Sequence, residues 1–441
     1  MMDRMERLRR RQKAFLVGAQ VRGEDNLFAL EDSLDELERL AHTAGLEVVG
    51  REQQRLNAIE PGTYIGTGKV KEIKGLAEAL GFDVVIFDDE LSPAQLRNLE
   101  RDLGVEILDR TALILDIFAL HARTREGALQ VELAQYIYRL PRLTRQWTHL
   151  SRQTVGGVGL RGPGETQLES DRRDIRRRMS QLRAELEQVR QQRGQQRRRR
   201  RRSGLPVIGI VGYTNAGKST LINRLSGADV LVEDMLFATL DPTTRRVALS
   251  GGKEVLFTDT VGFIQKLPTQ LVAAFRATLE EVQEADMLLH VVDASDHNVL
   301  EKVDAVEDVL DEIGAGDKPV VLALNKIDLI DPETELQSGA GPLAMKREPL
   351  TELQARYDHV IMVSAEQGVG IDDLLGEIEV MLAEQMVEID AVLPYNAGDV
   401  LDLWHTQGVI EVEEYDEAGV HIRGRLPRWA ASTVQEIQRQ P

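Results

Sequence analysis

The stretch Gly212-Tyr213-Thr214-Asn215-Ala216-Gly217-Lys218-Ser219 decides the fold of this chain. It follows the apolar run from Leu205 to Val211 and precedes a helix-like run that begins at Thr220. This is the pattern G-x-x-x-x-G-K-S in a strand–loop–helix context, which favours a phosphate-binding loop over a chance match. Backbone N–H groups and the positive end of the helix would hold the phosphates, Lys218 would reach the outer ones, and Ser219 would bind Mg²⁺.

Composition limits the class of protein. With 441 residues, 42 % of them apolar, the chain is long enough for two to four domains. It has no cysteine, which excludes disulfides and thiolate metal sites and is typical of a reducing cytosol. We also expect no signal peptide and no membrane span, because no apolar run has the required length.

Charge is distributed unevenly along the chain. The formal net charge of −19 argues against a protein that coats nucleic acid in general. Between Arg139 and Arg202, however, there are 19 arginines and 6 acidic residues. A basic block in an acidic protein is a candidate phosphate-binding element.

Residues 1–122 are predicted to form an α/β domain. Short apolar runs at 14–17, 46–49, 83–87 and 105–108 alternate with helical patterns at 32–44, 69–80, from Ser92 onward and at 111–121. Strands that alternate with helices indicate a parallel sheet covered by helices. The short motif Gly66-Thr67-Gly68-Lys69 lacks P-loop spacing, so we interpret it as the start of a helix rather than a phosphate site.

Residues 123–203 are predicted to form a basic antiparallel helical hairpin, with helices at 127–147 and 171–192. The second helix has a coiled-coil seam of Ile175, Met179, Leu182, Leu186 and Val189. The tip, residues 156–165, contains five glycines and a proline and cannot be helical.

Two interpretations of this tip stay open: a loop that adapts to RNA, or a flexible connector with solvated charges. The candidate RNA contacts are Arg152, Gly157, Gly159, Arg161, Gly162, Arg172 and Arg173. The six arginines at 197–202 are interpreted first as a solvated linker.

Residues 204–385 carry further nucleotide-binding motifs. Phe237-Ala238-Thr239-Leu240-Asp241 lies where a switch loop is expected, and the pattern alone does not choose between Thr239, Thr243 and Thr244. Asp259-Thr260-Val261-Gly262 follows a predicted strand, so that Asp259 would hold Mg²⁺ through water and the Gly262 N–H would contact the γ-phosphate. Asn325-Lys326-Ile327-Asp328 and Ser364-Ala365-Glu366 end two more strands.

This ordered set is that of a GTPase G domain, with Lys218, Asp259 and Gly262 as the predicted catalytic residues. Asp328 would accept hydrogen bonds from guanine N1–H and the 2-amino group, Asn325 would bond the base edge, Lys326 would lie along the P-loop, and the Ala365 N–H would face O6. Adenine lacks the 2-amino donor, and such a mismatch gives discrimination on the order of 10⁴. The motifs therefore predict GTP as substrate rather than ATP.

Two positions differ from the signalling GTPases. Phe263 stands where those enzymes have a glutamine that orients the attacking water. We therefore expect slow intrinsic turnover, with a partner or a bound ion completing the site. Asn215 matches the asparagine of GTPases that bind K⁺ beside the phosphates, although it could also serve only to cap the loop.

Residues 386–441 are predicted to form a small, acidic α+β domain. It would contain a strand at 387–392, a helix at 397–407 and a hairpin of 409–414 with 419–424. Its acidity favours contact with protein over contact with RNA.

The chain resembles the HflX family of ribosome-associated GTPases over nearly its whole length. The residues that carry the resemblance are GALQVELA at 127–134, GVGLRGPGETQLESDRR at 157–173, FATLD at 237–241 and DTVGF at 259–263. The run 197–202 and a loop at 331–353 look peculiar to this chain or its close relatives. The expected fold class is α/β, with a parallel N-terminal domain, a helical hairpin, a doubly wound G domain and a small α+β domain.

The resemblance implies that Ser219 and Thr239 bind Mg²⁺. It also implies a cytoplasmic GTPase that binds the large ribosomal subunit, both rRNA and ribosomal protein, near the peptidyl-transferase centre and dissociates ribosomes under stress. No motif requires a dimer, so we expect a monomer off the ribosome. Two alternatives are a nucleotide-controlled RNA-binding or ribosome-assembly factor, and a GTPase docked peripherally on a membrane. The second is weakened by the lack of a lipidation motif or a basic amphipathic helix.

Overall fold

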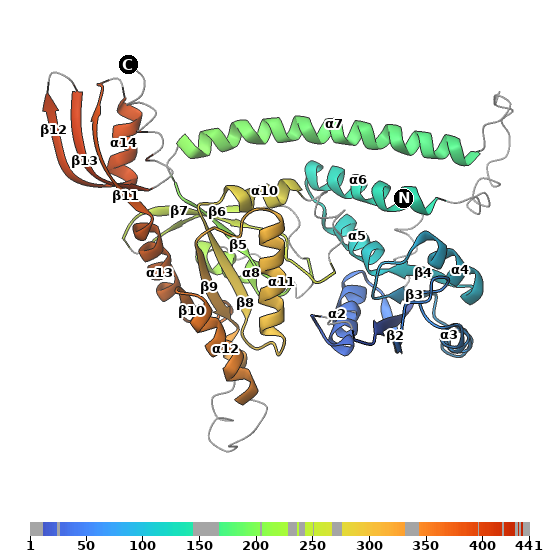
Figure 1. The fold of residues 1–441 in the computed structure, drawn as a ribbon. Coiled ribbons are helices and arrows are strands. Elements are labelled where there is room, and N and C mark those ends of the chain that lie inside the picture. Colours follow the sequence, from blue (N-terminus) through green and yellow to red (C-terminus); the bar gives the residue numbers. More distant parts are fainter. Residues whose placement is uncertain are drawn as a thin grey trace. The chain divides into compact units, whose positions relative to one another are not determined.

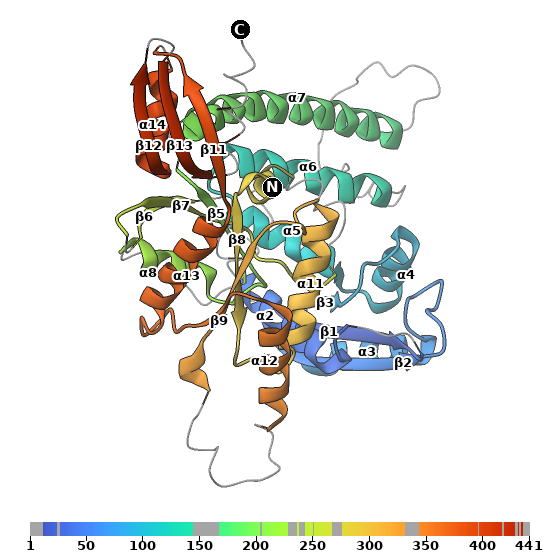
Figure 2. The same ribbon diagram turned by 60° about the vertical axis from the view of Figure 1, so that its left-hand side comes forward.

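The structure, a computed structural model, describes residues 12–23, 27–143, 167–202, 205–227, 236–237, 243–249, 251–266, 276–330, 344–395, 397–416, 419–427, 431 and 434. The chain forms two compact units. The first comprises residues 1–190, 235–241 and 266–276, and the second comprises residues 191–234, 242–265 and 277–441. Figures 1 and 2 show the elements of each unit.

The first unit contains a four-stranded parallel sheet with the strand order β2-β1-β3-β4. This confirms the parallel sheet predicted for the N-terminal region. The strands are β1 (Lys13–Val21), β2 (Glu47–Leu56), β3 (Val84–Phe87) and β4 (Glu106–Asp109). The helices between and after them are α2 (Leu30–Thr43), α3 (Thr67–Leu80), α4 (Pro93–Leu103) and α5 (Arg110–His121).

Helices cover both faces of this sheet because alternate residues of a strand point to opposite sides. Phe15 and Val17 of β1 pack in one apolar cluster with Val70 and Ile73 of α3. On the other face, a Cβ added to Gly18 would lie 2.9 Å from a methyl carbon of Leu30, which shows how closely α2 approaches β1. The capping box predicted at Ser92 is present, and Thr67 begins α3, as the helix-start interpretation requires.

The predicted helical hairpin is present as α6 (Arg125–Arg142) and α7 (Gln167–Arg202). Leu129 and Leu133 of α6 form a buried cluster with Met179 and Leu182 of α7, with Ile175 and Leu186 packed against it. Ion pairs join Glu132 to Arg178 and Arg125 to Glu185, so residue numbers increase along α6 in the direction in which they decrease along α7. The two helices are therefore antiparallel.

Two expectations for the helical hairpin are corrected. The run 197–202, expected to be a linker, continues α7 as helix, since arginine is a good helix former. α6 ends at Arg142, one residue after Pro141, rather than at residue 147. The predicted tip at 156–165 lies outside the described residues.

The second unit contains a six-stranded sheet with the order β10-β9-β8-β5-β7-β6, parallel except for the pair β6–β7. The strands are β5 (Val207–Val211), β6 (Thr244–Ala248), β7 (Glu254–Asp259), β8 (Met287–Asp293), β9 (Val320–Asn325) and β10 (Val360–Met362). The helices are α8 (Lys218–Ser226), α10 (Arg276–Glu284), α11 (Val299–Glu312), α12 (Ala344–Arg356) and α13 (Ile371–Glu384), with the 3₁₀ turn η2 (Ile327–Leu329).

Helices cover the two faces of this sheet as well. α8 and α13 pack on one face through Leu221 and Leu374, and α11 packs on the other through Val303. The loop expected at 331–353 is partly wrong, because residues 344–356 form α12 and Leu353 is buried in the same cluster as Val303.

The C-terminal segment forms a three-stranded antiparallel sheet with the order β11-β13-β12. Its elements are β11 (Met386–Leu393), α14 (Gly398–Gln407), β12 (Val409–Asp416) and β13 (Gly419–Pro427), close to the predicted ranges. Trp404 of α14 is fully buried in its core. Among the described residues, no helix has the length and apolar content needed to cross a membrane.

Candidate nucleotide-binding site

The P-loop connects β5 to α8 at the carboxyl end of the central strand. Gly217 has φ = 94° and directly precedes α8, and Gly212 has φ = 146°. A Cβ on Gly212 would lie 2.2 Å from the carbonyl oxygen of Val291, so only glycine fits there. The first N–H groups of α8 lack partners within the helix, and together with the helix dipole they favour an anion such as phosphate.

Lys218 is held inside this loop. Its Nζ donates hydrogen bonds to the carbonyl oxygens of Gly212 at 2.9 Å and Tyr213 at 2.7 Å. Burial lowers the pKa of Lys218 to about 8, and the negative charge of Asp259 opposes this only in part. A buried ammonium group with a depressed pKa gains electrostatically when an anion arrives beside it.

The side chains of Ser219 and Asp259, both predicted to hold Mg²⁺, lie next to each other. Ser219 Oγ donates to Asp259 Oδ2 at 3.3 Å, so the hydroxyl and the carboxylate converge from α8 and β7. Asp259 is buried, and its Oδ1 accepts a hydrogen bond from the Thr260 N–H at 3.0 Å. An oxygen donor set of this kind fits Mg²⁺, which keeps several of its water ligands in proteins. Thr239, the other predicted ligand, lies outside the described residues, as do Ala238, Leu240 and Asp241.

Gly262 lies directly against the P-loop. A Cβ added to it would be 2.9 Å from Thr214 Cγ2 and 3.0 Å from Lys218 Nζ. Any larger residue would collide with the loop. The structure thus brings together Lys218, Asp259 and Gly262, the three residues predicted to be catalytic.

Phe263 has a structural role in this site. Its carbonyl oxygen accepts a hydrogen bond from the Thr214 N–H at 2.7 Å, and its own N–H donates to the Gly212 carbonyl at 3.1 Å. The Phe263 side chain is buried, with 2 % of its surface exposed. Its ring therefore packs in the interior, and the backbone around it is paired to the P-loop like a short strand.

The base-binding end of the site is built around Asn325. Its Nδ2 donates to the Ala216 carbonyl at 2.9 Å, and its Oδ1 accepts from the Ala365 N–H at 2.9 Å. Asn325 thereby joins the P-loop to the Ser364-Ala365-Glu366 loop. Ser364 is fully buried, and its Oγ accepts from the Gln367 N–H at 3.1 Å.

Lys326 and Asp328 follow on the turn after β9. Lys326 has φ = 64°, and its Nζ forms an ion pair with Asp293 Oδ2 at 2.7 Å. Asp328 is half-buried in η2 and its carboxylate can still accept from a base. The predicted contacts of Asp328 and of the Ala365 N–H with guanine stay predictions, as does the position of Lys326 along the P-loop.

Other predicted residues lie apart from this centre or outside the description. Asn215 has φ = 62° and an exposed side chain, so its proposed role toward K⁺ stays a prediction. Phe237 packs its ring on Phe118 in the first unit, with ring centroids 4.6 Å apart. Of the candidate RNA contacts, Arg172 and Arg173 lie in α7, and Arg152, Gly157, Gly159, Arg161 and Gly162 lie outside the described residues.

His290 is a core residue, in agreement with its interpretation from sequence. It is 1 % exposed within β8, and burial, together with the positive charges of Lys218 and Arg356, lowers its pKa to about 3. The imidazole is therefore neutral at physiological pH. In the described part of the chain, no group of three or more acidic or histidine side chains could hold a metal ion.

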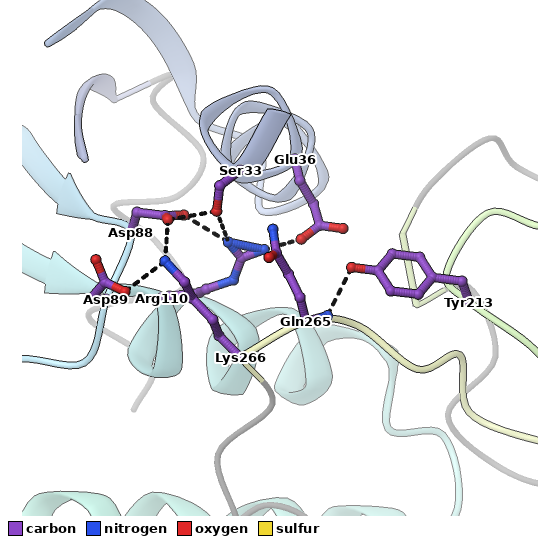
Figure 3. Close-up of polar contacts among 8 residues, drawn as sticks. All are labelled: Ser33, Glu36, Asp88, Asp89, Arg110, Tyr213, Gln265 and Lys266. Atoms are coloured by element: carbon purple, nitrogen blue, oxygen red, sulfur yellow. Dashed lines mark hydrogen bonds and ion pairs between the residues drawn. The ribbon is translucent and has the colours of Figure 1, made fainter. Parts of the chain in front are cut away.

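Sequence reasoning did not predict several long-range contacts of residues in or near the site. The hydroxyl of Tyr213 accepts a hydrogen bond from the Gln265 N–H at 2.8 Å, which fixes the segment after Phe263 (Figure 3). Asp293 is the partner of Lys326, and Lys266 pairs with Asp88 and Asp89. No motif predicts these contacts, because each joins positions far apart in the chain.

Comparisons with known proteins agree with this site. Residues 207–326 match the family described as 50S ribosome-binding GTPase, residues 31–119 match the GTP-binding GTPase N-terminal family, and residues 121–200 match the corresponding middle region. GTPase HflX of Caldanaerobacter subterraneus subsp. tengcongensis is 46 % identical over 425 residues, which cover 96 % of this chain and 93 % of the relative. GTPase HflX of Escherichia coli K12 is 44 % identical over 398 residues, covering 90 % of each chain.

A solved structure is also similar. It is a GTP-binding protein from the archaeon Sulfolobus solfataricus in complex with GDP, 28 % identical, with a TM-score of 0.42 and coverage of 85 % of this chain and 99 % of that one. The motif set, its convergence at the ends of β5, β7 and β9, and the identity to the two relatives along almost the full length lead to one conclusion. This chain belongs to the HflX family of GTPases and is a GTP-hydrolysing enzyme.

Proposed function

We propose that GTP binding and hydrolysis control the association of this protein with the large ribosomal subunit, where it binds rRNA near the peptidyl-transferase centre and dissociates ribosomes under stress. The observation that carries the proposal is a basic helical hairpin covalently attached to a GTPase domain. The family description of residues 207–326 as a 50S ribosome-binding GTPase supports the same partner.

The arginines of α7 divide into two groups. Arg178 forms two hydrogen bonds with the carboxylate of Glu132, at 2.9 and 2.8 Å, and Arg172 donates to the Leu143 carbonyl at 2.9 Å. These side chains hold the two helices together. Arg176 and Arg183 instead have exposed side chains.

Exposed arginines at this spacing suit the phosphate backbone of folded RNA. Double-stranded RNA is recognised largely by shape and through its phosphates and 2′-hydroxyls, which requires charge rather than a base-reading motif. We therefore assign rRNA contact to the exposed arginines of α7 and to the tip predicted at 156–165.

The nucleotide would act through the two switch segments. The γ-phosphate accepts hydrogen bonds from Lys218 and from the Gly262 N–H, and loss of that phosphate on hydrolysis releases the segment. Mg²⁺, held by Ser219 and through water by Asp259, would neutralise phosphate charge. K⁺ beside Asn215 would supply positive charge that an arginine supplies in other GTPases.

The test is GTP hydrolysis and binding with purified large ribosomal subunits in KCl buffer at matched ionic strength. We expect strong stimulation of turnover by the subunit and tighter subunit binding with a non-hydrolysable GTP analogue than with GDP. Arg176→Ala and Arg183→Ala together should weaken binding and lower the salt slope by about one per arginine. Arg101→Ala, which removes an exposed arginine from α4, is the control.

Two outcomes would contradict the proposal. The first is the absence of both stimulation and nucleotide-dependent binding, which would leave a GTPase with another partner. The second is equally strong, salt-sensitive binding of isolated structured RNA, which would favour a factor that acts on RNA without separating ribosomes.

A further inference from the structure

A cluster of charged side chains in the N-terminal sheet contains a lysine from the nucleotide-binding region. Lys266 Nζ lies 2.6 Å from Asp88 Oδ2 and 2.6 Å from Asp89 Oδ1 (Figure 3). Lys266 follows the Asp259–Gly262 motif by four residues, and it belongs to the first compact unit. The chain passes from the second unit to the first between Gln265 and Lys266.

The acidic side chains of this cluster favour a second positive charge beside Arg110. Asp88 is fully buried, and its Oδ1 lies 2.7 Å from Arg110 Nη1 while its Oδ2 accepts from Ser33 Oγ at 2.6 Å. Arg110, 1 % exposed, is also paired with Glu36. The three acidic groups Glu36, Asp88 and Asp89 thus outnumber the one arginine, and Lys266 supplies the second positive charge.

The cluster also occupies the place where a sheet of this topology binds a ligand. With the order β2-β1-β3-β4, the direction of strand addition reverses between β1 and β3. Ligands of doubly wound sheets bind outside the carboxyl ends of the strands at that reversal. Asp88 directly follows β3, so Lys266 stands where such a domain would hold a ligand.

A second contact in the same unit concerns the other switch segment. The Leu236 N–H donates to Thr43 Oγ1 at 3.3 Å, and Phe237, which is 3 % exposed, sets its ring on Phe118. Thr43 belongs to α2, like Ser33 and Glu36, and Phe118 belongs to α5, like Arg110. α2 and α5 therefore contact Leu236 and Phe237 of one switch segment. Ser33 and Glu36 of α2 and Arg110 of α5 also belong to the cluster that binds Lys266, which follows the other switch segment.

We propose that α2 and α5 form an internal docking site for the two switch segments, and that Lys266 is a positioning residue whose binding to Asp88 and Asp89 opposes the GTP-bound arrangement. In the GTP-bound state the Gly262 N–H contacts the γ-phosphate, so the segment that follows Gly262 must be free to adjust when that phosphate arrives. Only Phe263, Ile264 and Gln265 separate Gly262 from Lys266. A fixed Lys266 therefore restrains that adjustment, whereas GDP has no γ-phosphate and does not require it.

The proposal predicts a change in nucleotide preference. A ligand that binds one of two conformations gains apparent affinity when the competing conformation is weakened. Lys266→Met removes the charge and keeps the length, so we expect it to raise the affinity for a non-hydrolysable GTP analogue relative to GDP by at least about fivefold, the lower end of coupling between sites. Lys266→Arg keeps the positive charge, so its ratio of GTP-analogue affinity to GDP affinity should equal that of the wild type.

The experiment measures dissociation constants of fluorescent GDP and GTP analogue for full-length protein without ribosomes. Lys69→Met is the matched control, since Lys69 also bridges two carboxylates, Glu52 at 2.9 Å and Glu72 at 2.8 Å, in the same sheet domain. It should leave the ratio unchanged. Asp89→Asn, at a half-exposed partner, should raise the ratio less than Lys266→Met, and the double variant should add little to Lys266→Met.

Equal changes for both nucleotides, or an unchanged ratio in Lys266→Met, would show a purely structural ion pair and overturn the proposal. A ratio that rises as much in Lys69→Met would do the same. Since no ribosome is present, these outcomes are independent of the proposed ribosomal function.

Discussion

The backbone of Phe263 is hydrogen-bonded to the P-loop on both sides of Tyr213, through the Thr214 N–H and the Gly212 carbonyl. The position that carries a catalytic glutamine in signalling GTPases thus carries a structural residue here. Its apolar side chain is buried, with 2 % of its surface exposed, and cannot form a hydrogen bond to water. Water orientation must then come from another group.

Replacing Phe263 tests this role. Phe263→Leu should keep single-turnover GTP hydrolysis within about twofold, because it conserves most of the buried apolar volume. Phe263→Gln should destabilise the protein by about 1–3 kcal/mol through a buried amide without partners, and turnover should not rise. The measurement is single-turnover hydrolysis beside urea unfolding. Faster hydrolysis in the glutamine variant would show that the side chain does reach the reacting water.

Substitution of Asn325 should lower the stability of the protein, whereas substitution of Asp328 should change its nucleotide specificity. Asn325→Ala leaves the Ala216 carbonyl and the Ala365 N–H without their buried partner, so unfolding of the nucleotide-free protein should become easier by about 1–3 kcal/mol. Asp328→Asn, in a half-exposed turn, should leave stability unchanged and weaken GTP binding, since it removes an acceptor for the guanine donors. Urea unfolding and competition with ATP distinguish the two. A stable Asn325→Ala protein would refute the bridging role.

Ser219 and Asp259 should be needed for Mg²⁺-dependent binding. Ser219→Ala and Asp259→Ala each remove an oxygen from the pair that lies 3.3 Å apart, so the gain in GTP affinity on adding Mg²⁺ should largely disappear. Ser226→Ala, at the other end of α8, is the control and should respond to Mg²⁺ like the wild type. Unchanged turnover in both site variants would show that the metal ligands lie elsewhere.

Asn215 should govern any response to K⁺. If its exposed side chain binds the ion, GTP hydrolysis is faster in KCl than in NaCl at equal ionic strength, and Asn215→Ala abolishes the difference. Folding should be preserved, since the side chain is exposed. Equal rates of the wild type in the two salts would leave Asn215 with the role of capping the loop.

His290 should contribute to acid sensitivity. Its pKa is about 3 in the folded protein and about 6.5 when unfolded, so between these values the unfolded chain binds the extra proton. The stability contributed by neutral His290 is fully present above pH 6.5 and declines by up to about 1.4 kcal/mol per pH unit as the pH falls toward 3.

His290→Leu should therefore show a shallower loss of unfolding free energy between pH 6.5 and 5 than the wild type, measured with urea. His42→Gln, at an exposed histidine, is the control and should follow the wild-type slope. Parallel slopes for wild type and His290→Leu would mean that His290 is not protonated on unfolding in this range.

The sequence by itself determined the parts of the molecule that depend on local spacing. The P-loop, the Asp259–Gly262 motif and the base-binding motifs each occupy a few consecutive residues, and each follows an apolar run that forms a strand. Parallel strands bring their carboxyl ends to one edge, so convergence of these motifs follows from their order. The alternation of strands and helices likewise predicted the parallel N-terminal sheet, and the 4-3 spacing of apolar residues predicted the seam of α6 and α7.

Only the tertiary structure decided what Phe263, Asn325 and Lys266 do. The sequence around Phe263 does not indicate whether its ring faces water or the interior. The sequence around Asn325 does not indicate that this side chain bridges the P-loop to the Ala365 loop. Lys266 lies 178 positions from Asp88, and no periodicity connects them. Such contacts arise from the packing of separate elements, where burial and charge balance select a partner that spacing along the chain does not specify.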